Sequence, residues 1–128
     1  MKTVMVAVIL TGLVLAGCAS DEVLVATARS PISDVPIPQK LKYADKESYS
    51  REEGGRREYS HVYRGNASKR SVALFFKDHL PRHGWKFVSD SELRGLRMLE
   101  FTKGKERLTL QMFEEWGSAN LQLRLREY

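Results

Sequence analysis

Apolar and polar residues alternate between residues 107 and 126. Apolar side chains occupy every second position in two runs, namely Leu108, Leu110, Met112 and Leu121, Leu123, Leu125. Because successive side chains of a β-strand point to opposite faces, this spacing predicts two strands. Each strand should turn its apolar residues toward a core and its polar residues toward solvent.

A helical pattern precedes these strands. Apolar residues recur at intervals of three and four, at Val72, Phe75, Phe76 and Leu80. Ser68 is a suitable N-cap, because a serine oxygen can accept a hydrogen bond from the first turn, and Gly84 is typical of a helix stop. The pattern predicts a helix over residues 68–80 that covers one face of a sheet. Trp85, just after the stop, should close the core.

Four further strands are predicted, over residues 43–53, 58–64, 85–89 and 96–102. Gly54-Gly55 suits a hairpin turn, because both glycines tolerate a positive φ. The predicted order is β-β-α-β-β-β-β. It indicates an α+β fold, in which a single, mostly antiparallel sheet has one helix packed on one face.

The first residues differ from the rest. Lys2 is followed by an apolar run from Val4 to Ala16, which is the layout of a secretory signal peptide. As a helix this run would be about 20 Å long, too short for the roughly 30 Å hydrocarbon core of a bilayer. We therefore expect residues 1–17 to be a signal peptide and not a permanent transmembrane segment.

The run ends in Leu15-Ala16-Gly17-Cys18, which resembles the lipobox of bacterial lipoprotein signals. The resemblance implies that the Cys18 thiol receives a diacylglycerol, that the peptide is cut before Cys18, and that the new amino group is open to acylation by a fatty acid such as palmitate. Two or more acyl chains bind a bilayer stably. Ala19 stands where inner-membrane members carry aspartate, which implies the outer membrane, facing the periplasm. An ordinary secretory peptide with a chance cysteine is the alternative.

Residues 18–40 are predicted to be a lipidated N-terminus and an extended tether, followed by a compact domain over residues 41–128. Three of the four prolines of the chain fall in this segment, at Pro31, Pro36 and Pro38. Proline restricts φ and removes an amide donor. We expect the tether to hold the domain some tens of ångströms from the lipid. The pattern leaves open whether Val23–Ala26 docks on the domain or on the membrane.

A second resemblance covers about residues 34–113. Four short motifs are similar to small uncharacterised bacterial lipoproteins: Asp34–Pro38, Val62–Gly65, Phe75–Trp85 and Phe101–Gly104. The likeness supports the fold and implies no catalytic residue.

The composition and the motifs of the chain limit the kinds of catalytic or metal site that it can form. The 128 residues suit one small domain, and a single cysteine excludes a disulfide framework or a cysteine-rich zinc site. His79 and His83 are four residues apart, but Pro81 lies between them. The adjacent carboxylates, at Glu52-Glu53 and Glu114-Glu115, lie beside predicted turns, and no serine has the Gly-x-Ser-x-Gly context. We therefore predict no catalytic residue, metal site or cofactor.

The net charge of +5 favours an anionic partner. If the uncovered face of the sheet carries the polar positions of the last two strands, it is basic and rich in hydrogen-bonding groups: Arg107, Thr109, Gln111, Gln122, Arg124 and Arg126. In the envelope the available anions are phospholipid heads, lipopolysaccharide and cell-wall carboxylates. A solvated face balanced by Glu106 and Glu127 is the alternative. Nucleic acid is not expected, because the chain leaves the cytoplasm.

Together these features predict a membrane-anchored lipoprotein of the bacterial cell envelope, acting as a non-enzymatic binding or accessory module. Its partners would be the bilayer, through acylated Cys18, and an envelope protein or anionic component at Arg107, Arg124, Arg126 or Trp116. Trp116 in its loop is either an anchor for a partner or, as we expect, folded back onto the domain edge. The alternative is a small-molecule or metal-binding lipoprotein, or a minor hydrolase, with a pocket between sheet and helix lined by His61, His79 or Glu100.

Overall fold

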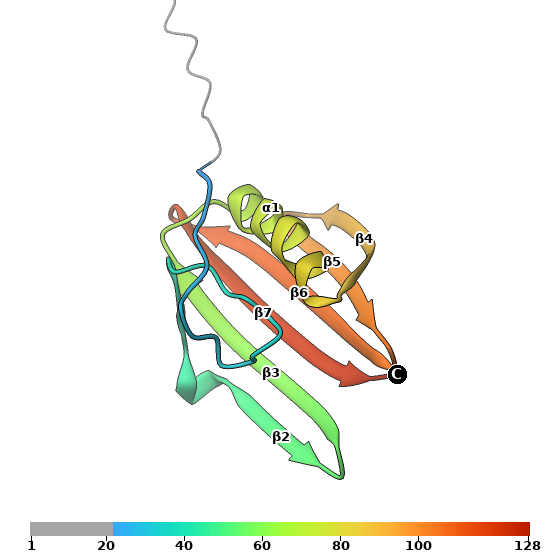
Figure 1. The fold of residues 1–128 in the computed structure, drawn as a ribbon. Coiled ribbons are helices and arrows are strands. Elements are labelled where there is room, and N and C mark those ends of the chain that lie inside the picture. The colour runs from blue at the N-terminus through green and yellow to red at the C-terminus, as the bar shows by residue number, and fades with distance from the viewer. Residues whose placement is uncertain (1–21) are drawn as a thin grey trace, which may run out of the picture.

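The computed structural model describes residues 22–128, so the predicted signal peptide and Cys18 lie outside the described residues. Seven antiparallel strands form one open sheet, and one α-helix of the described residues packs on one face of it (Figure 1). This confirms the predicted α+β fold class. The elements follow the chain in the order β1 (Leu41–Tyr43), β2 (Tyr49–Glu53), β3 (Arg56–Gly65), α1 (Lys69–His79), β4 (Lys86–Leu93), β5 (Leu96–Lys103), β6 (Glu106–Glu115) and β7 (Ser118–Glu127).

The sheet order is β1-β3-β7-β6-β5-β4, with β2 also paired to β3. The sheet has one strand more than the pattern predicted, because β3 is 10 residues long and its two halves pair with different partners. β2 pairs with residues 56–60 and β1 with residues 63–65. A Cβ at Gly65 would lie 1.8 Å from the carbonyl oxygen of Lys40, so β1 can pair there only because residue 65 has no side chain.

The apolar face of the sheet is covered by α1. The alternating leucines and the methionine of β6 and β7 are buried, as predicted, and they share one core with the helical stripe of Val72, Phe75, Phe76 and Leu80. Trp85 is 1% exposed and closes the core, also as predicted. The apolar side chains that recur every two residues in the strands and every 3.6 residues in the helix therefore pack together in a single apolar layer.

Local signals set the ends of the helix. The Ser68 side chain accepts a hydrogen bond from the amide of Ser71 at 3.0 Å. At the other end, Leu80–His83 continues as a 3₁₀ turn and ends at Gly84, which has a φ of 85°. Serine at the start and a left-handed glycine at the end are the signals that the sequence carries.

The segment before β1 is part of the packed domain. Leu24, Ile32, Val35 and Ile37 are each at most 6% exposed, and Figure 1 shows this segment beside α1, in front of β3 and β7. For residues 22–40 this corrects the extended tether, which was predicted over residues 18–40, and it corrects the domain boundary predicted at residue 41. The prolines restrict the backbone, but they leave the apolar side chains between them free to pack.

Backbone hydrogen bonds hold the two arms of this segment together. The amide of Thr27 donates to the carbonyl of Ile37 at 2.8 Å, and the amide of Gln39 donates to the carbonyl of Val25 at 2.7 Å. Between them, Ala26 and Pro38 form an isolated antiparallel bridge. The segment thus satisfies backbone groups within itself where the sheet offers no partner.

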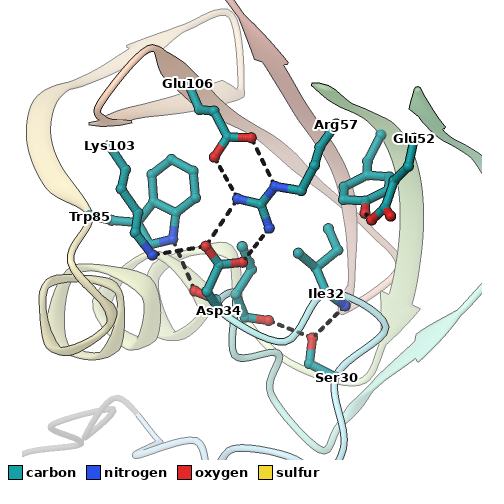
Figure 2. Close-up of polar contacts among 10 residues, drawn as sticks. Ser30, Ile32, Asp34, Glu52, Arg57, Trp85, Lys103 and Glu106 are labelled. Atoms are coloured by element: carbon teal, nitrogen blue, oxygen red, sulfur yellow. Dashed lines mark hydrogen bonds and ion pairs between the residues drawn. The ribbon is translucent and has the colours of Figure 1, made fainter. Parts of the chain in front are cut away.

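One carboxylate ties the segment to the sheet. Asp34 accepts two hydrogen bonds from Arg57 of β3, at 2.7 and 3.0 Å, and one from Lys103 of β5, at 2.9 Å (Figure 2). Arg57 also donates to Glu106 of β6, at 2.6 and 2.8 Å. The backbone carbonyl of Asp34 accepts a hydrogen bond from the Trp85 indole at 2.9 Å. The segment is therefore joined through Asp34 to two strands and to the residue that closes the core.

These contacts shift the pKa of the carboxyl. Burial raises the pKa of Asp34, but hydrogen bonds from Arg57 and Lys103 outweigh burial and lower the pKa from 3.8 to about 2. Because this pKa is lower in the fold than in the unfolded chain, the ionised carboxylate stabilises the fold above about pH 4. That contribution is lost as the pH falls toward 2.

A second carboxylate links α1 to the sheet in the same way. Asp90 of β4 accepts hydrogen bonds from Arg97 of β5, at 2.8 and 3.0 Å, and forms an ion pair with Lys77 of α1. The hydrogen bond from Arg97 lowers the pKa of Asp90, and with the contribution of Lys77 the pKa reaches about 2. A paired aspartate thus links each of these two elements, the helix and the N-terminal segment, to the sheet, in addition to the apolar packing.

We expect Asp34→Asn to lower the free energy of unfolding by about 2 kcal/mol at pH 7, because lowering a carboxyl pKa from 3.8 to about 2 corresponds to that energy. Urea denaturation of residues 19–128 measures the change. The difference from the unsubstituted chain should shrink as the pH is lowered from 4 to 2.

Asp78→Asn is the matched control. Asp78 pairs with Arg82 at 3.0 Å on the surface, and both side chains are more than half exposed, so its loss should change stability little. Equal effects of the two substitutions, or a difference that does not depend on pH, would contradict the role given to Asp34.

Candidate functional site

The uncovered face of the sheet brings together the basic residues expected there. The register pairs Arg107 of β6 with Arg126 of β7, Thr109 with Arg124, and Gln111 with Gln122. All six side chains lie opposite the buried leucines, because side chains alternate along each strand. We call these six residues the arginine face.

Like charges lie side by side on this face. Arg107 and Arg126 are direct cross-strand neighbours, an arrangement that is destabilising unless the charge is compensated. The guanidinium of Arg107 lies 4.7 Å from the ring centroid of Tyr128, and its Nε lies 3.6 Å from a carboxylate oxygen of Glu100. That Nε has no hydrogen-bond partner. Arg107 is therefore only partly compensated.

Among the described residues, Arg124 and Arg126 form no ion pair. The two glutamates that would balance the face are engaged elsewhere. Glu106 pairs with Arg57 at 2.6 Å, and Glu127 pairs with Arg56 at 3.3 Å. Glu106 and Glu127 therefore do not balance this face in the way that the alternative from the sequence expected.

A shallow hollow between β3 and β7 adjoins these arginines. Arg124 and Arg126 line it together with Ser60 and with one carboxylate, Glu58. The hollow offers a hydroxyl and two guanidinium groups to a bound molecule, with Glu58 as the opposing charge. The excess of donors over acceptors favours an anionic ligand.

Apolar side chains are exposed at the other end of the same strands. Leu93 pairs with Leu96 across β4 and β5, and the register Arg97↔Met112 places Leu96 next to Phe113 of β6. These three side chains are 74%, 38% and 43% exposed, in that order. Trp116 follows in the turn between β6 and β7. We call these four residues the apolar row.

Trp116 does not fold back onto the domain edge, so that expectation was wrong. Its side chain is fully exposed, and its backbone has a φ of 53°. The residue stands at the tip of the hairpin turn, before Gly117, where the backbone directs the indole away from the core. The indole is therefore exposed, and its role as an anchor for a partner stays a prediction.

The space between sheet and helix is filled. Phe76, Leu80, Leu99, Phe101 and Leu110 are fully buried there. His79 stacks on Phe75 at 4.1 Å between ring centroids, and Glu100 lies beside Arg107, so neither lines an internal pocket. The described residues contain no group of three or more histidine, cysteine or acidic side chains arranged to hold a metal ion.

One polar contact was missed by sequence reasoning. The Oγ of Ser50 on β2 lies 2.6 Å from Nε2 of His61 on β3, and Nδ1 of His61 lies 3.2 Å from the Tyr63 hydroxyl. His61 is 1% exposed, and burial lowers its pKa, so the neutral imidazole is favoured. The two residues are eleven apart in sequence, and only the β2–β3 register brings them together.

This contact alone does not make a hydrolase site. A serine nucleophile needs a base held by an orienting group, oxyanion donors and a cleft for the substrate. The orienting partner of His61 is a tyrosine hydroxyl, and neither Ser50 nor His61 lines any of five hollows on the surface of the described residues. The contact satisfies the buried imidazole of His61 through a hydroxyl of the neighbouring strand.

Comparison with known proteins adds a family. The START domain-like family model matches residues 46–115, which run from the 3₁₀ turn before β2 to the last residue of β6. No curated protein and no solved structure matches the chain. Within the described residues, no helix has the length and apolar character needed to cross a membrane. The region matched by this family model covers more than half of the 128 residues. The chain therefore belongs to the START domain-like family.

Proposed function

We propose that this protein is a non-enzymatic lipoprotein of the bacterial cell envelope, anchored to the outer membrane through acylated Cys18 and facing the periplasm. Its domain serves as a binding module for an anionic envelope component, which it contacts through the arginine face. The lipobox, Leu15–Cys18, supports the anchor, and the arginines of β6 and β7, of which Arg107 is only partly compensated and Arg124 and Arg126 form no ion pair among the described residues, support the binding role.

The observation that carries the binding role is the charge arrangement on the arginine face. Arg107 and Arg126 are cross-strand neighbours, Arg124 lies on the same face, and neither Arg124 nor Arg126 pairs with an acid among the described residues. A bound anion would relieve this repulsion, so the folded domain gains stability when the face is occupied.

The chemistry of the face narrows the ligand class. Guanidinium groups bind phosphate and carboxylate through paired hydrogen bonds, and the side chains of Thr109, Gln111 and Gln122 add donors and acceptors. Phosphates of lipids or lipopolysaccharide and carboxylates of the cell wall share this chemistry. Because the site is exposed, binding should weaken as the salt concentration rises.

Labelled palmitate tests the anchor. We expect the unsubstituted chain to incorporate the label and to fractionate with membranes, and Cys18→Ala to lose both, because the thiol is the proposed attachment point. Incorporation of label into the Cys18→Ala chain, or a soluble unlabelled chain with residues 1–17 still attached, would refute the proposal.

Charge reversal tests the arginine face. Replacing Arg107, Arg124 and Arg126 with glutamate should reduce binding to an anionic component at least tenfold, since three attractive contacts become repulsive. Separate sedimentation assays with phosphatidylglycerol vesicles, lipopolysaccharide and cell-wall sacculi identify which anion is bound.

The matched control reverses three exposed basic residues outside the face, Arg29, Lys42 and Lys46. It changes the net charge by the same amount, so a general effect of charge would weaken binding equally in both variants. Equal losses in the two variants, or retained binding after reversal of the arginine face, would argue against this site.

A further inference from the structure

The apolar row consists of four exposed apolar side chains at one end of the sheet. Cross-strand pairing joins Leu93 to Leu96 and brings Leu96 beside Phe113, and the fully exposed Trp116 follows three residues later. Contiguous exposed aromatic and aliphatic side chains indicate a surface that is covered in use. The row lies on the open side of the sheet, which α1 does not shield.

The described chain begins at the same end of the molecule. Lys69, the first residue of α1, contacts the β4–β5 turn and the end of β6, because its Nζ donates to the carbonyl of Gly95 at 2.8 Å and its backbone amide donates to Glu114. A groove beside α1 is lined by Val23 and Leu74, which are 89% and 44% exposed. Figure 1 shows the first described residues, the start of α1 and the β6–β7 turn at one end, with the C-terminus at the other.

The length of chain between this end and Cys18 is short. Cys18 precedes Glu22 by four residues, and an extended chain spans at most about 3.6 Å per residue, so the distance is at most about 14 Å. The packing of residues 24–40 removes the longer reach that an extended tether would allow. An acylated Cys18 would therefore hold the apolar row beside the bilayer.

We propose that the apolar row docks into the interface of the bilayer that holds Cys18. This inference rests on the proposed lipid anchor and extends it, since the domain itself would then contact the lipid. Tryptophan is favoured at the boundary between headgroups and acyl chains, because its ring is largely apolar and its N–H can meet water or phosphate. Trp116 occupies the tip of the end that is held there.

The charges around the row are compatible with a lipid surface. Glu92 forms an ion pair with the Nζ of Lys69, which offsets the charge of Glu92, and Glu114 accepts a hydrogen bond from the backbone amide of Lys69. Arg94 lies in the turn between Leu93 and Leu96, is exposed, and forms no ion pair among the described residues. Its guanidinium is free to meet lipid phosphate.

The two tryptophans of the chain make the docking measurable. The acylated chain is reconstituted into phosphatidylcholine vesicles whose acyl chains carry bromine, which quenches tryptophan fluorescence on contact. We expect loss of the emission from Trp116 and no loss from Trp85, which is 1% exposed in the core. Trp116→Phe should abolish the quenched part and leave the remainder unchanged.

A matched pair of substitutions on β4 localises the contact. Leu93→Ser removes an exposed apolar side chain from the row and should reduce the quenching of Trp116 severalfold. Val88→Ser removes an exposed apolar side chain toward the other end of the same strand and should leave quenching unchanged. Equal effects of the two substitutions would overturn the docking surface.

The possible outcomes distinguish a failure of the docking proposal from a failure of the proposed lipid anchor. A chain that incorporates palmitate and stays on the vesicles, but whose Trp116 is not quenched, overturns the docking and leaves the anchor intact. A chain without palmitate overturns both. The third outcome is that the fluorescence of Trp116 is already shielded without vesicles and that the chain has twice the monomer mass. This result would show that a second copy covers the row, and it would overturn docking to lipid.

Discussion

The paired hydrogen bonds between Arg57 and Asp34 are the contact on which the arrangement of this molecule depends. A partly buried carboxylate is costly unless it is paired and hydrogen-bonded, and Asp34 meets both conditions through Arg57 and Lys103. Asp34 belongs to the segment before β1, whereas its partners belong to β3 and β5. The contact therefore decides where that segment lies, and its carbonyl bond to Trp85 connects it to the core.

The position of the segment shapes both candidate surfaces. With α1 it occupies one face of the sheet, which leaves the other face to the arginines. It also brings the first described residues to the end that carries the apolar row. Arg107 and Trp116 are nine positions apart on β6 and its turn, roughly 30 Å along an extended strand. If the apolar row docks as proposed, Arg107 and Arg126 lie some tens of ångströms from that bilayer, which favours cell-wall carboxylates over the headgroups of the anchoring membrane.

The elements that sequence reasoning predicted well are those whose pattern is local. The leucines of β6 and β7 alternate over a whole strand, so the buried face and the basic face could both be assigned from spacing. Ser68 and Gly84 marked the ends of the helical region by their own hydrogen-bonding and backbone preferences. The six residues of the arginine face were predicted to share a surface, but it was not predictable that Arg124 and Arg126 form no ion pair within the described residues. Glu106 and Glu127 were equally available in sequence, and they pair with Arg57 and Arg56 only because of the register.

The amino-acid sequence by itself determined the α+β class, most of the secondary structure and the likeness of Leu15–Cys18 to a lipobox, because each depends on residues that are close neighbours along the chain. Only the tertiary structure decided that residues 24–40 pack, that Ser50 meets His61 and that Trp116 stands free. The proline spacing of residues 24–40 is compatible both with an extended tether and with a packed segment. The segment packs because Asp34 forms an ion pair with Arg57 and because the sheet offers an apolar surface. Contacts between distant residues carry no local signal, so spacing alone could not reveal them.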